Sequence, residues 1–304
     1  MSEILLETKG LTKAYGKRNV VSNVDIHVKK GSIYGLIGRN GAGKTTLMKM
    51  VAGMTKPTDG SFDYVGIEGG NKDAFGKIGA LIEIPALMPS LSAHDNLKLK
   101  CIAYGKGDDA FIEDTLNLVG LSKTGKKKTG KFSLGMKQRL GIALALVGDP
   151  DILLLDEPIN GLDPQGIAEV RDMLTKLNQE RGITIIISSH ILAELAKLAT
   201  DYAIIDNGVI VEESTREELE LRCRTKLVIR CDDPKGAMKI LKDSGYSDIE
   251  EGEDNSIYVY EEGDVGPDMN MKICQAGIMV RSFAYETVDL EEYFLNTIKS
   301  KGVS

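Results

Sequence analysis

The sequence predicts an α/β fold with a parallel sheet, followed by a small α+β module, and three observations lead to this. A glycine-rich loop at 38–45 lies between an apolar segment with the pattern of a strand and a segment with the pattern of a helix. A continuous aliphatic run at 152–155 is typical of a central parallel strand buried on both faces. From about residue 222 the order of strand and helix patterns changes, which indicates a second domain.

Eight consecutive residues fit the phosphate-binding pattern G-x-x-x-x-G-K-[ST]. They are Gly38, Arg39, Asn40, Gly41, Ala42, Gly43, Lys44 and Thr45. The glycines allow backbone N–H groups to turn toward phosphate oxygens, and the N-terminus of the next helix adds partial positive charge. We expect Lys44 to reach the β- and γ-phosphates and Thr45 to hold Mg²⁺, and we assign Thr46 to the same nucleotide-binding set. The chain is therefore predicted to bind a nucleoside triphosphate.

The aliphatic run at 152–155 ends in two acids, Asp156 and Glu157. Carboxylates at the C-terminal end of a parallel strand emerge where open α/β sheets bind ligands. Asp156 is suited to hold Mg²⁺ through water, and Glu157 is placed to polarise the water that attacks the γ-phosphate. The sequence therefore predicts that the triphosphate is hydrolysed as well as bound.

The chain resembles the nucleotide-binding subunit of an ATP-binding cassette (ABC) transporter, because six family motifs occur once and in order within about residues 3–220. They are an aromatic residue (Tyr15), the Walker A loop (38–45), the signature (132–139), Walker B (152–157), the D-loop (161–164) and the switch histidine (His190). The resemblance implies that Tyr15 stacks on the adenine of ATP. It also implies that His190 senses the γ-phosphate and holds the attacking water.

The resemblance implies a P-loop NTPase of the ABC ATPase type over residues 1–221, with a RecA-like core, an antiparallel β subdomain and a helical subdomain at about 86–148. The residue patterns agree with this division. Period-two alternation surrounds the first helix in residues 3–65, and strand–helix alternation returns over 150–220. Three segments of helical spacing lie in the expected subdomain, at 91–104, 108–119 and 134–147. Asn207-Gly208 predicts a hairpin turn.

The signature departs from the family's common Leu-Ser-Gly-Gly-Gln, since it reads Phe-Ser-Leu-Gly-Met at 132–136. Ser133 and Gly135 match the family's residues at their positions. The resemblance implies that both donate to the γ-phosphate of a neighbouring subunit's ATP. A whole helical subdomain separates Ser133 from its own phosphate loop, so two chains are expected to close head to tail around two ATP molecules, with Asp163 at the interface. A homodimer is favoured, and pairing with a related subunit stays open.

Glu83 stands where most family members carry a glutamine that touches the metal. We therefore place Glu83 among both the metal ligands and the catalytic residues. Glutamate at this position is typical of bacitracin-resistance and lantibiotic-immunity exporters of Gram-positive bacteria, which the signature run also resembles. The resemblance thus implies export of antimicrobial peptides. The alternative is that Glu83 is a neutral substitution.

Length and composition favour an enzyme subunit that reaches the membrane through another chain. The chain has 304 residues, 42% of them hydrophobic, and no apolar stretch approaches the ~18 residues of a membrane helix. We expect no direct membrane insertion, a transmembrane permease as partner, and a cytoplasmic location at the inner face of the membrane. No signal peptide is visible at the acidic N-terminus. A net charge of −7 argues against a nucleic-acid surface.

Residues 222–304 are predicted to form a small α+β domain with the order βαββαβ and a last helix. The expected strands are 226–231, 256–260 and 278–285, with a further strand near Asp248, and the expected helices are 234–241, 268–275 and 290–299. This segment carries no catalytic motif. It either braces the cassette or its dimer, which we favour, or binds a regulator.

Other functions remain open for the whole chain. Some cassette ATPases act on ribosomes or DNA, but these carry paired cassettes with a charged linker or an inserted coiled coil, and this sequence has neither. A regulatory or sensing role without transport is a second alternative, and export of another substrate is a third. The contacts that select the cargo are expected on the membrane chain.

Overall fold

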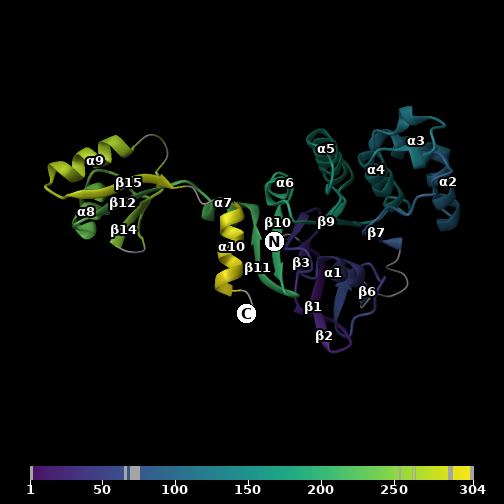
Figure 1. Cartoon of the computed structure of the whole chain (residues 1–304), viewed down its shortest axis with the longest axis horizontal. Helices are drawn as coiled ribbons and strands as arrows, with labels where there is room; N and C mark the ends of the chain where they lie inside the picture. Colours follow the sequence, from purple (N-terminus) through teal and green to yellow (C-terminus); the bar gives the residue numbers. More distant parts are fainter. Residues whose placement is uncertain are drawn as a thin grey trace. The chain divides into compact units, whose positions relative to one another are not determined.

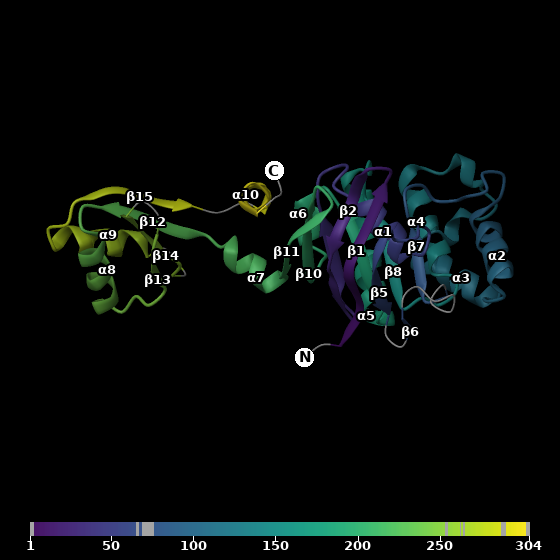
Figure 2. The same ribbon diagram turned by 90° about the horizontal axis from the view of Figure 1, so that it is seen from below.

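The computed structural model describes residues 3–64, 67–68, 76–252, 255–261, 263, 265–286 and 290–301. The chain divides into two compact units (Figures 1 and 2). The first, which we call the cassette unit, consists of Met1–Arg216 and Phe294–Ser304, and the second, the C-terminal module, consists of Glu217–Tyr293.

The last helix, α10 (Leu290–Lys301), is divided between the two units. The sequence analysis instead places all of 222–304 in the second domain. The division assigns residues from Phe294 onward to the cassette unit, and Phe294 and Ile298 are buried. The helical pattern of this segment predicts an apolar face, but a pattern does not say which surface will cover that face.

The core of the cassette unit is a six-stranded sheet in the order β11-β10-β4-β9-β8-β7. Its strands are β4 (Ile33–Ile37), β7 (Ile78–Leu81), β8 (Ile152–Asp156), β9 (Thr184–Ser189), β10 (Asp201–Asp206) and β11 (Val209–Thr215). All neighbours are parallel except β10 and β11, which form the predicted hairpin. The strands β4, β8, β9 and β10 are buried along their whole length, as expected for a parallel sheet covered on both faces.

A second, antiparallel sheet covers helix α1 (Lys44–Val51). Its strands are β1 (Ile4–Tyr15), β2 (Arg18–Val24), β3 (His27–Lys29), β5 (Asp59–Tyr64) and β6 (Ile67–Glu68). One apolar core joins the two sheets, because Leu47 and Met50 of α1 pack in the same cluster as Leu6 of β1 and Leu154 of β8. The helix that follows the phosphate loop is therefore held on both sides.

The helical subdomain contains α2 (Ala93–Tyr104), α3 (Asp109–Leu118) and α4 (Leu134–Ala145), which confirms the three predicted helices. Each begins at a side chain that caps its first turn. Ser92 and Asp95 form a capping box on α2, Asp108 caps α3, and Ser133 caps α4. Between the sheet strands, α5 (Pro164–Arg181) follows β8 and α6 (Leu192–Ala196) follows β9.

The C-terminal module is a four-stranded antiparallel sheet with two helices on one face (Figure 2). After α7 (Arg216–Arg222), its elements are β12 (Lys226–Cys231), α8 (Pro234–Asp243), β13 (Ile249–Glu251), β14 (Ser256–Val259), α9 (Gly266–Gln275) and β15 (Val280–Glu286). The strand order is β13-β14-β12-β15, so the predicted βαββαβ order is confirmed, including the strand near Asp248. Leu227, Ile229 and Cys231 alternate toward the helices and form the core.

The separate cores predict that the module unfolds without disturbing the nucleotide site. Ile229→Ala removes buried methyl groups from the centre of β12 and should cost about 2–5 kcal/mol of module stability. Arg230→Ala, at the exposed next position, is the control and should change little. Calorimetry should show an earlier transition for Ile229→Ala alone, with unchanged binding of a fluorescent ATP analogue. Loss of ATP binding in a folded Ile229→Ala protein would show that the module helps to build the site.

Candidate functional site

The phosphate loop begins where β4 ends, at the carboxyl edge of the parallel sheet. Two of its glycines are required by geometry. A side chain on Gly38 would place its Cβ 2.5 Å from the carbonyl oxygen of Ile205. Gly43 has φ 110°, a conformation that other residues rarely adopt, and its Cβ would lie 2.8 Å from the carbonyl oxygen of Val20. The glycines therefore allow the loop to pass close to its neighbours before α1 starts.

Lys44 is a buried cation enclosed by the loop itself. Its Nζ donates to the carbonyl oxygens of Gly38 at 2.6 Å and Arg39 at 3.3 Å. It also lies 3.2 Å from Oε1 of Glu157. A recess of about 170 Å³ adjoins this ammonium group, and its polar lining includes Asn40, Thr45, Thr46 and Glu157. The loop thus presents a cation and backbone groups in a hollow that suits the phosphates of a nucleotide.

Asp156 closes the other side of the site. It is the last residue of β8, and its buried carboxylate accepts a hydrogen bond from the Thr45 hydroxyl at 2.7 Å and another from the Ser188 hydroxyl at 2.6 Å. The Ser188 oxygen in turn accepts from the backbone N–H of Glu157 at 3.0 Å. These hard oxygen donors are the kind that Mg²⁺ prefers, so the residues fit that ion.

Glu157 contacts two of the predicted site residues, the catalytic His190 and the nucleotide-binding Lys44. Its Oε2 lies 2.7 Å from Nδ1 of His190, and its Oε1, which is buried and accepts no hydrogen bond, faces the ammonium group of Lys44. The backbone of Glu157 is in the left-handed region, with φ 51°. Such strain in a non-glycine residue persists only where the surrounding structure imposes it, and it is frequent at active sites.

Glu83 follows β7, the strand next to β8, at the same edge of the sheet. The parallel register pairs Leu81 with Leu155, so Glu83 and Glu157 each stand two residues beyond the last paired position of neighbouring strands. Its side chain is exposed and its Oε1 lies 2.6 Å from Nζ of Lys49 on α1. The structure therefore places Glu83 beside α1, with a lysine as its partner.

Six predicted nucleotide-binding residues are not among the described residues that line the phosphate-loop recess: Gly38 and Ala42 of the loop itself, and Tyr15, Ser133, Gly135 and Asp163. Tyr15 is exposed at the end of β1, with Nζ of Lys13 5.2 Å from the centre of its ring. Ser133 and Gly135 lie at the start of α4, and Asp163 caps α5, accepting from the N–H of Gly166 at 2.9 Å. The signature and the D-loop lie close together, because a Cβ added to Gly161, the first D-loop residue, would lie 3.2 Å from the side chain of Leu134, the third residue of the signature.

Two residues of this region were missed by the sequence analysis. Ser188 donates a hydrogen bond to the Asp156 carboxylate and accepts one from the backbone N–H of Glu157. The sequence does contain a signal for Ser188. Its hydroxyl lies near the end of a predicted buried strand, two residues before the predicted catalytic histidine, and a buried hydroxyl needs a polar partner. Lys49, the partner of Glu83, gave no such signal, because a lysine at the end of a helix is most simply solvated.

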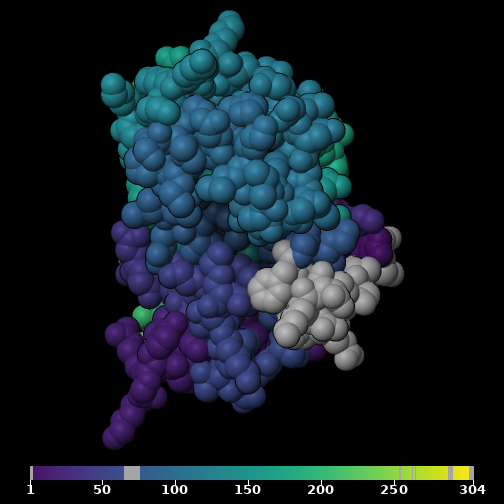
Figure 3. Space-filling view, turned by 90° about the vertical axis from the view of Figure 1, so that its right-hand side faces the viewer, coloured from purple at the N-terminus to yellow at the C-terminus, as the bar shows by residue number. Residues whose placement is uncertain are grey.

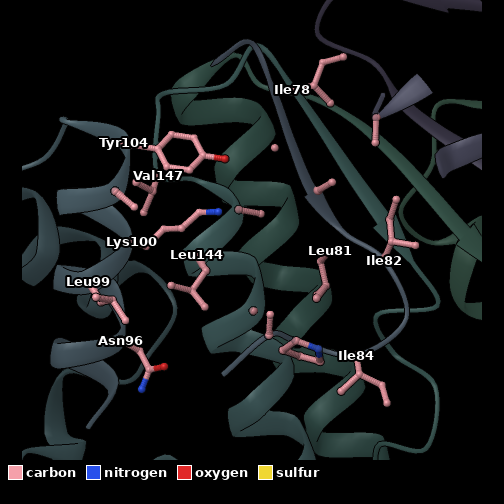
Figure 4. A pocket seen from close by; sticks show the side chains of 18 of the residues that line it. Ile78, Leu81, Ile82, Ile84, Asn96, Leu99, Lys100, Tyr104, Leu144 and Val147 are labelled. Atoms are coloured by element: carbon pink, nitrogen blue, oxygen red, sulfur yellow. The ribbon is translucent and has the colours of Figure 1, made fainter. Parts of the chain in front are cut away.

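An apolar groove lies beside β7, between this strand and helices α2 and α4. Its volume is about 460 Å³, and its lining includes the exposed side chains of Met54, Ile84, Met88, Leu99 and Tyr104. Figure 3 views this side of the cassette unit, with the helical subdomain above the antiparallel sheet. Figure 4 shows Lys100 and Tyr104 on the α2 side, opposite Ile82 and Ile84. The charged residue of the described lining is Lys100, whose Nζ lies 4.3 Å from the centre of the Tyr104 ring.

The fold and the site together define a P-loop ATPase of the ABC type, and comparison with known proteins agrees. The family model described as ABC transporter matches residues 21–160. The bacitracin transport ATP-binding protein BcrA of Enterococcus faecalis is 39% identical over 304 residues, which cover 99% of each chain. The lantibiotic transport ATP-binding protein SrtF of Streptococcus pyogenes is 46% identical over 209 residues, covering 69% of this chain and 90% of SrtF. The chain belongs to the family of ABC transporter ATP-binding proteins.

A solved structure extends this comparison to the fold. The dimeric structure of a post-hydrolysis state of the ATP-binding cassette MJ0796, bound to ADP and Pi, matches with a TM-score of 0.64 at 26% identity. The match covers 70% of this chain and 99% of MJ0796. The predicted fold class is confirmed, and the chain is an ATPase that binds adenine nucleotides.

The position of Ser188 predicts a selective effect on metal-dependent binding. Ser188→Ala leaves a carboxylate oxygen of Asp156 and the N–H of Glu157 without their partner, which should cost about 1–3 kcal/mol of stability. ATP binding in the presence of Mg²⁺ should weaken more than binding in its absence, because the Asp156 carboxylate loses its fixed orientation. Titration calorimetry with and without Mg²⁺ measures this difference.

Ser189→Ala is the matched control for this prediction. Ser189 is equally buried, but its hydroxyl accepts from the N–H of Ile191 and does not touch the Walker B acids. Ser189→Ala should lower the stability of the protein without changing the effect of Mg²⁺ on ATP binding. An equal Mg²⁺ effect in both variants would contradict the role of Ser188.

Proposed function

We propose that the chain drives the export of antimicrobial peptides, such as bacitracin or lantibiotics, through a separate membrane subunit. The observation that carries this proposal is the relation to BcrA, which extends over nearly the whole chain and includes the C-terminal module. SrtF, named for lantibiotic transport, supports the same class of cargo.

In the proposed reaction, Lys44 binds the β- and γ-phosphates and Glu157 removes a proton from the attacking water. His190, 2.7 Å from Glu157, orients this carboxylate and contacts the γ-phosphate. The ammonium group of Lys44 already faces Glu157, so binding of a phosphate places the substrate directly beside the base. Phosphoryl transfer requires mainly positioning and charge stabilisation, which these groups supply.

Thr45 and Asp156 are the proposed holders of Mg²⁺. When bound, this ion would neutralise charge on the β- and γ-phosphates. The Thr45 hydroxyl lies 2.7 Å from the Asp156 carboxylate, and Ser188 holds that carboxylate by a second hydrogen bond, which supports a role for both oxygens as ligands of the ion. We place Glu83 at the edge of the same site as a ligand whose charge affects both metal binding and coupling.

Two copies of the chain are proposed to complete two sites. Ser133 caps α4 by accepting from the N–H of Met136 at 3.3 Å, which leaves its own O–H able to donate. Together with the N–H of Gly135, it would bind the γ-phosphate held by the other subunit, at a helix N-terminus that favours anions. Asp163 would lie at this interface and Tyr15 would stack on adenine. The dimeric form of MJ0796 supports this arrangement, and we propose a homodimer.

The proposed partner in the membrane is a permease, and the apolar groove is its proposed docking place. No helix in the described part of the chain is long and apolar enough to cross a membrane. We propose a peripheral position at the cytoplasmic face, with an amphipathic helix of the permease in the groove. Its apolar side would cover Leu99 and Met88, and an acidic residue would meet Lys100. We assign the C-terminal module a bracing role.

The catalytic assignment predicts different defects for two variants of the purified protein. Glu157→Gln should retain ATP binding, lose about a hundredfold or more in turnover, and accumulate an ATP-bound dimer, because the base is replaced by a neutral isostere. Lys44→Ala should lose nucleotide binding, since it removes a cation from the triphosphate. Phosphate release and size-exclusion chromatography with ATP measure both effects. Wild-type turnover by Glu157→Gln would show that another group is the base.

The groove assignment predicts loss of transport without loss of chemistry. Leu99→Asp places a carboxylate in the groove and should reduce the tolerance of cells to bacitracin or a lantibiotic when the complete transporter is present. The ATPase rate of the isolated protein should stay near that of the wild type. Ile102→Asp is the control, because Ile102 is exposed on the same helix but does not line the groove. Equal tolerance in both variants would contradict docking at this groove.

A further inference from the structure

Glu83 and Glu157 share an unusual backbone conformation at one edge of the sheet. Both have positive φ, at 64° and 51°. The other described non-glycine residues with positive φ are Asn23, Asp149, Asn207 and Asn255. Asparagine and aspartate tolerate this region because their short side chains bond locally, whereas glutamate lacks that compensation. The two glutamates follow adjacent parallel strands, so the strain is concentrated where β7 and β8 end.

Lys49 is the group that contacts the first of these glutamates. Its Nζ lies 2.6 Å from Oε1 of Glu83, a short charge-assisted hydrogen bond. Lys49 is four residues after Thr45 in α1, so both side chains lie on the same face of the helix. Thr45 bonds to Asp156 of β8, and Lys49 bonds to Glu83, two residues after the end of β7. One face of α1 therefore holds the ends of two neighbouring strands.

The residues on both sides of Glu83 line the apolar groove. Ile82, Ile84 and Pro85 all line it, and Ile84 is among the most exposed apolar side chains described. The ion pair with Lys49 thus restrains the segment that forms one wall of the groove. It links this wall to the helix whose first residues form the phosphate loop.

We propose that Lys49 is a positioning residue that competes with Mg²⁺ for the Glu83 carboxylate and restrains the groove wall while it holds that carboxylate. This inference rests on the proposed role of Glu83 at the metal. Glu83 is largely exposed, so its ion pair is of the weak kind that a divalent cation with ATP displaces readily. Exchange of partners by one carboxylate would then connect nucleotide binding with the shape of the docking groove.

The first test measures how binding depends on Mg²⁺ in the full-length protein. Lys49→Met removes the charge but keeps a long side chain of similar helix propensity. It should lower the Mg²⁺ concentration needed for half-maximal binding of a fluorescent ATP analogue by about two- to fivefold, the range expected for a partly exposed ion pair. Lys49→Arg should behave as the wild type. Lys9→Met, which breaks an exposed ion pair with Asp63 in the antiparallel sheet, is the control and should have no effect.

A double-mutant cycle separates positioning from a merely structural role. In a Glu83→Gln background, Lys49→Met should produce no further change in the Mg²⁺ requirement, because the carboxylate under competition is absent. An equal shift in both backgrounds would overturn the proposal. So would an unchanged Mg²⁺ requirement in Lys49→Met alone.

A second readout needs neither nucleotide nor metal. In protein purified without nucleotide, hydrogen exchange of the segment 82–88 should be faster in Lys49→Met than in the wild type, and unchanged in Lys9→Met. Unaltered exchange in Lys49→Met would overturn the restraint of the groove wall. Failure of the wild type to hydrolyse Mg·ATP would instead contradict the proposed function, and the exchange experiment would still decide the part played by Lys49.

Discussion

The buried carboxylate of Asp156 is the constraint on which the arrangement of the site depends. It receives one hydrogen bond from Thr45 on α1 and one from Ser188 on β9, while its own backbone belongs to β8. A buried charge is costly unless it is paired or hydrogen-bonded, so these three elements are held in one relative position. Because α1 starts at Lys44, fixing Asp156 also fixes where the phosphate loop closes against the sheet.

The proposed catalytic groups lie beside Asp156 along the same edge of the sheet. Glu157 is the next residue after Asp156, and Ser188 also binds its backbone N–H. His190 comes two residues after Ser188, so the same strand end that orients Asp156 brings the imidazole to Glu157. The parallel order β9-β8-β7 then adds Glu83 at the neighbouring position. Adjacent strand ends, each contributing one or two polar residues, are enough to assemble the groups proposed for the reaction.

The sequence predicted the elements well, because each has a local cause. Buried strands have continuous aliphatic runs, and the helices α2, α3 and α4 begin at recognisable capping residues. The contacts of Ser188 and Lys49 were not predictable in the same way. Each depends on the register between strands or on a rotamer, and neither leaves a periodic pattern. The sequence placed Phe294 in the second domain, whereas the structure assigns it to the cassette unit, since amphipathicity does not identify the covering surface.

The signature region illustrates how a locally complete structure would take part in the proposed two-chain site. The Ser133 oxygen and the Asp163 carboxylate already satisfy backbone N–H groups of their own helices, so these turns are rigid in the isolated subunit. In the proposed dimer, the Ser133 hydroxyl and the N–H of Gly135 in the first turn of α4 would be the donors to an anion held by the other subunit. The phosphate loop of the same chain is enclosed by its own Lys44 and Glu157 and is not lined by these donors. In the proposed dimer, preformed donors on one subunit and a preformed phosphate cradle on the other would cost little conformational entropy to join, so binding energy from ATP would be available to bring the two chains together.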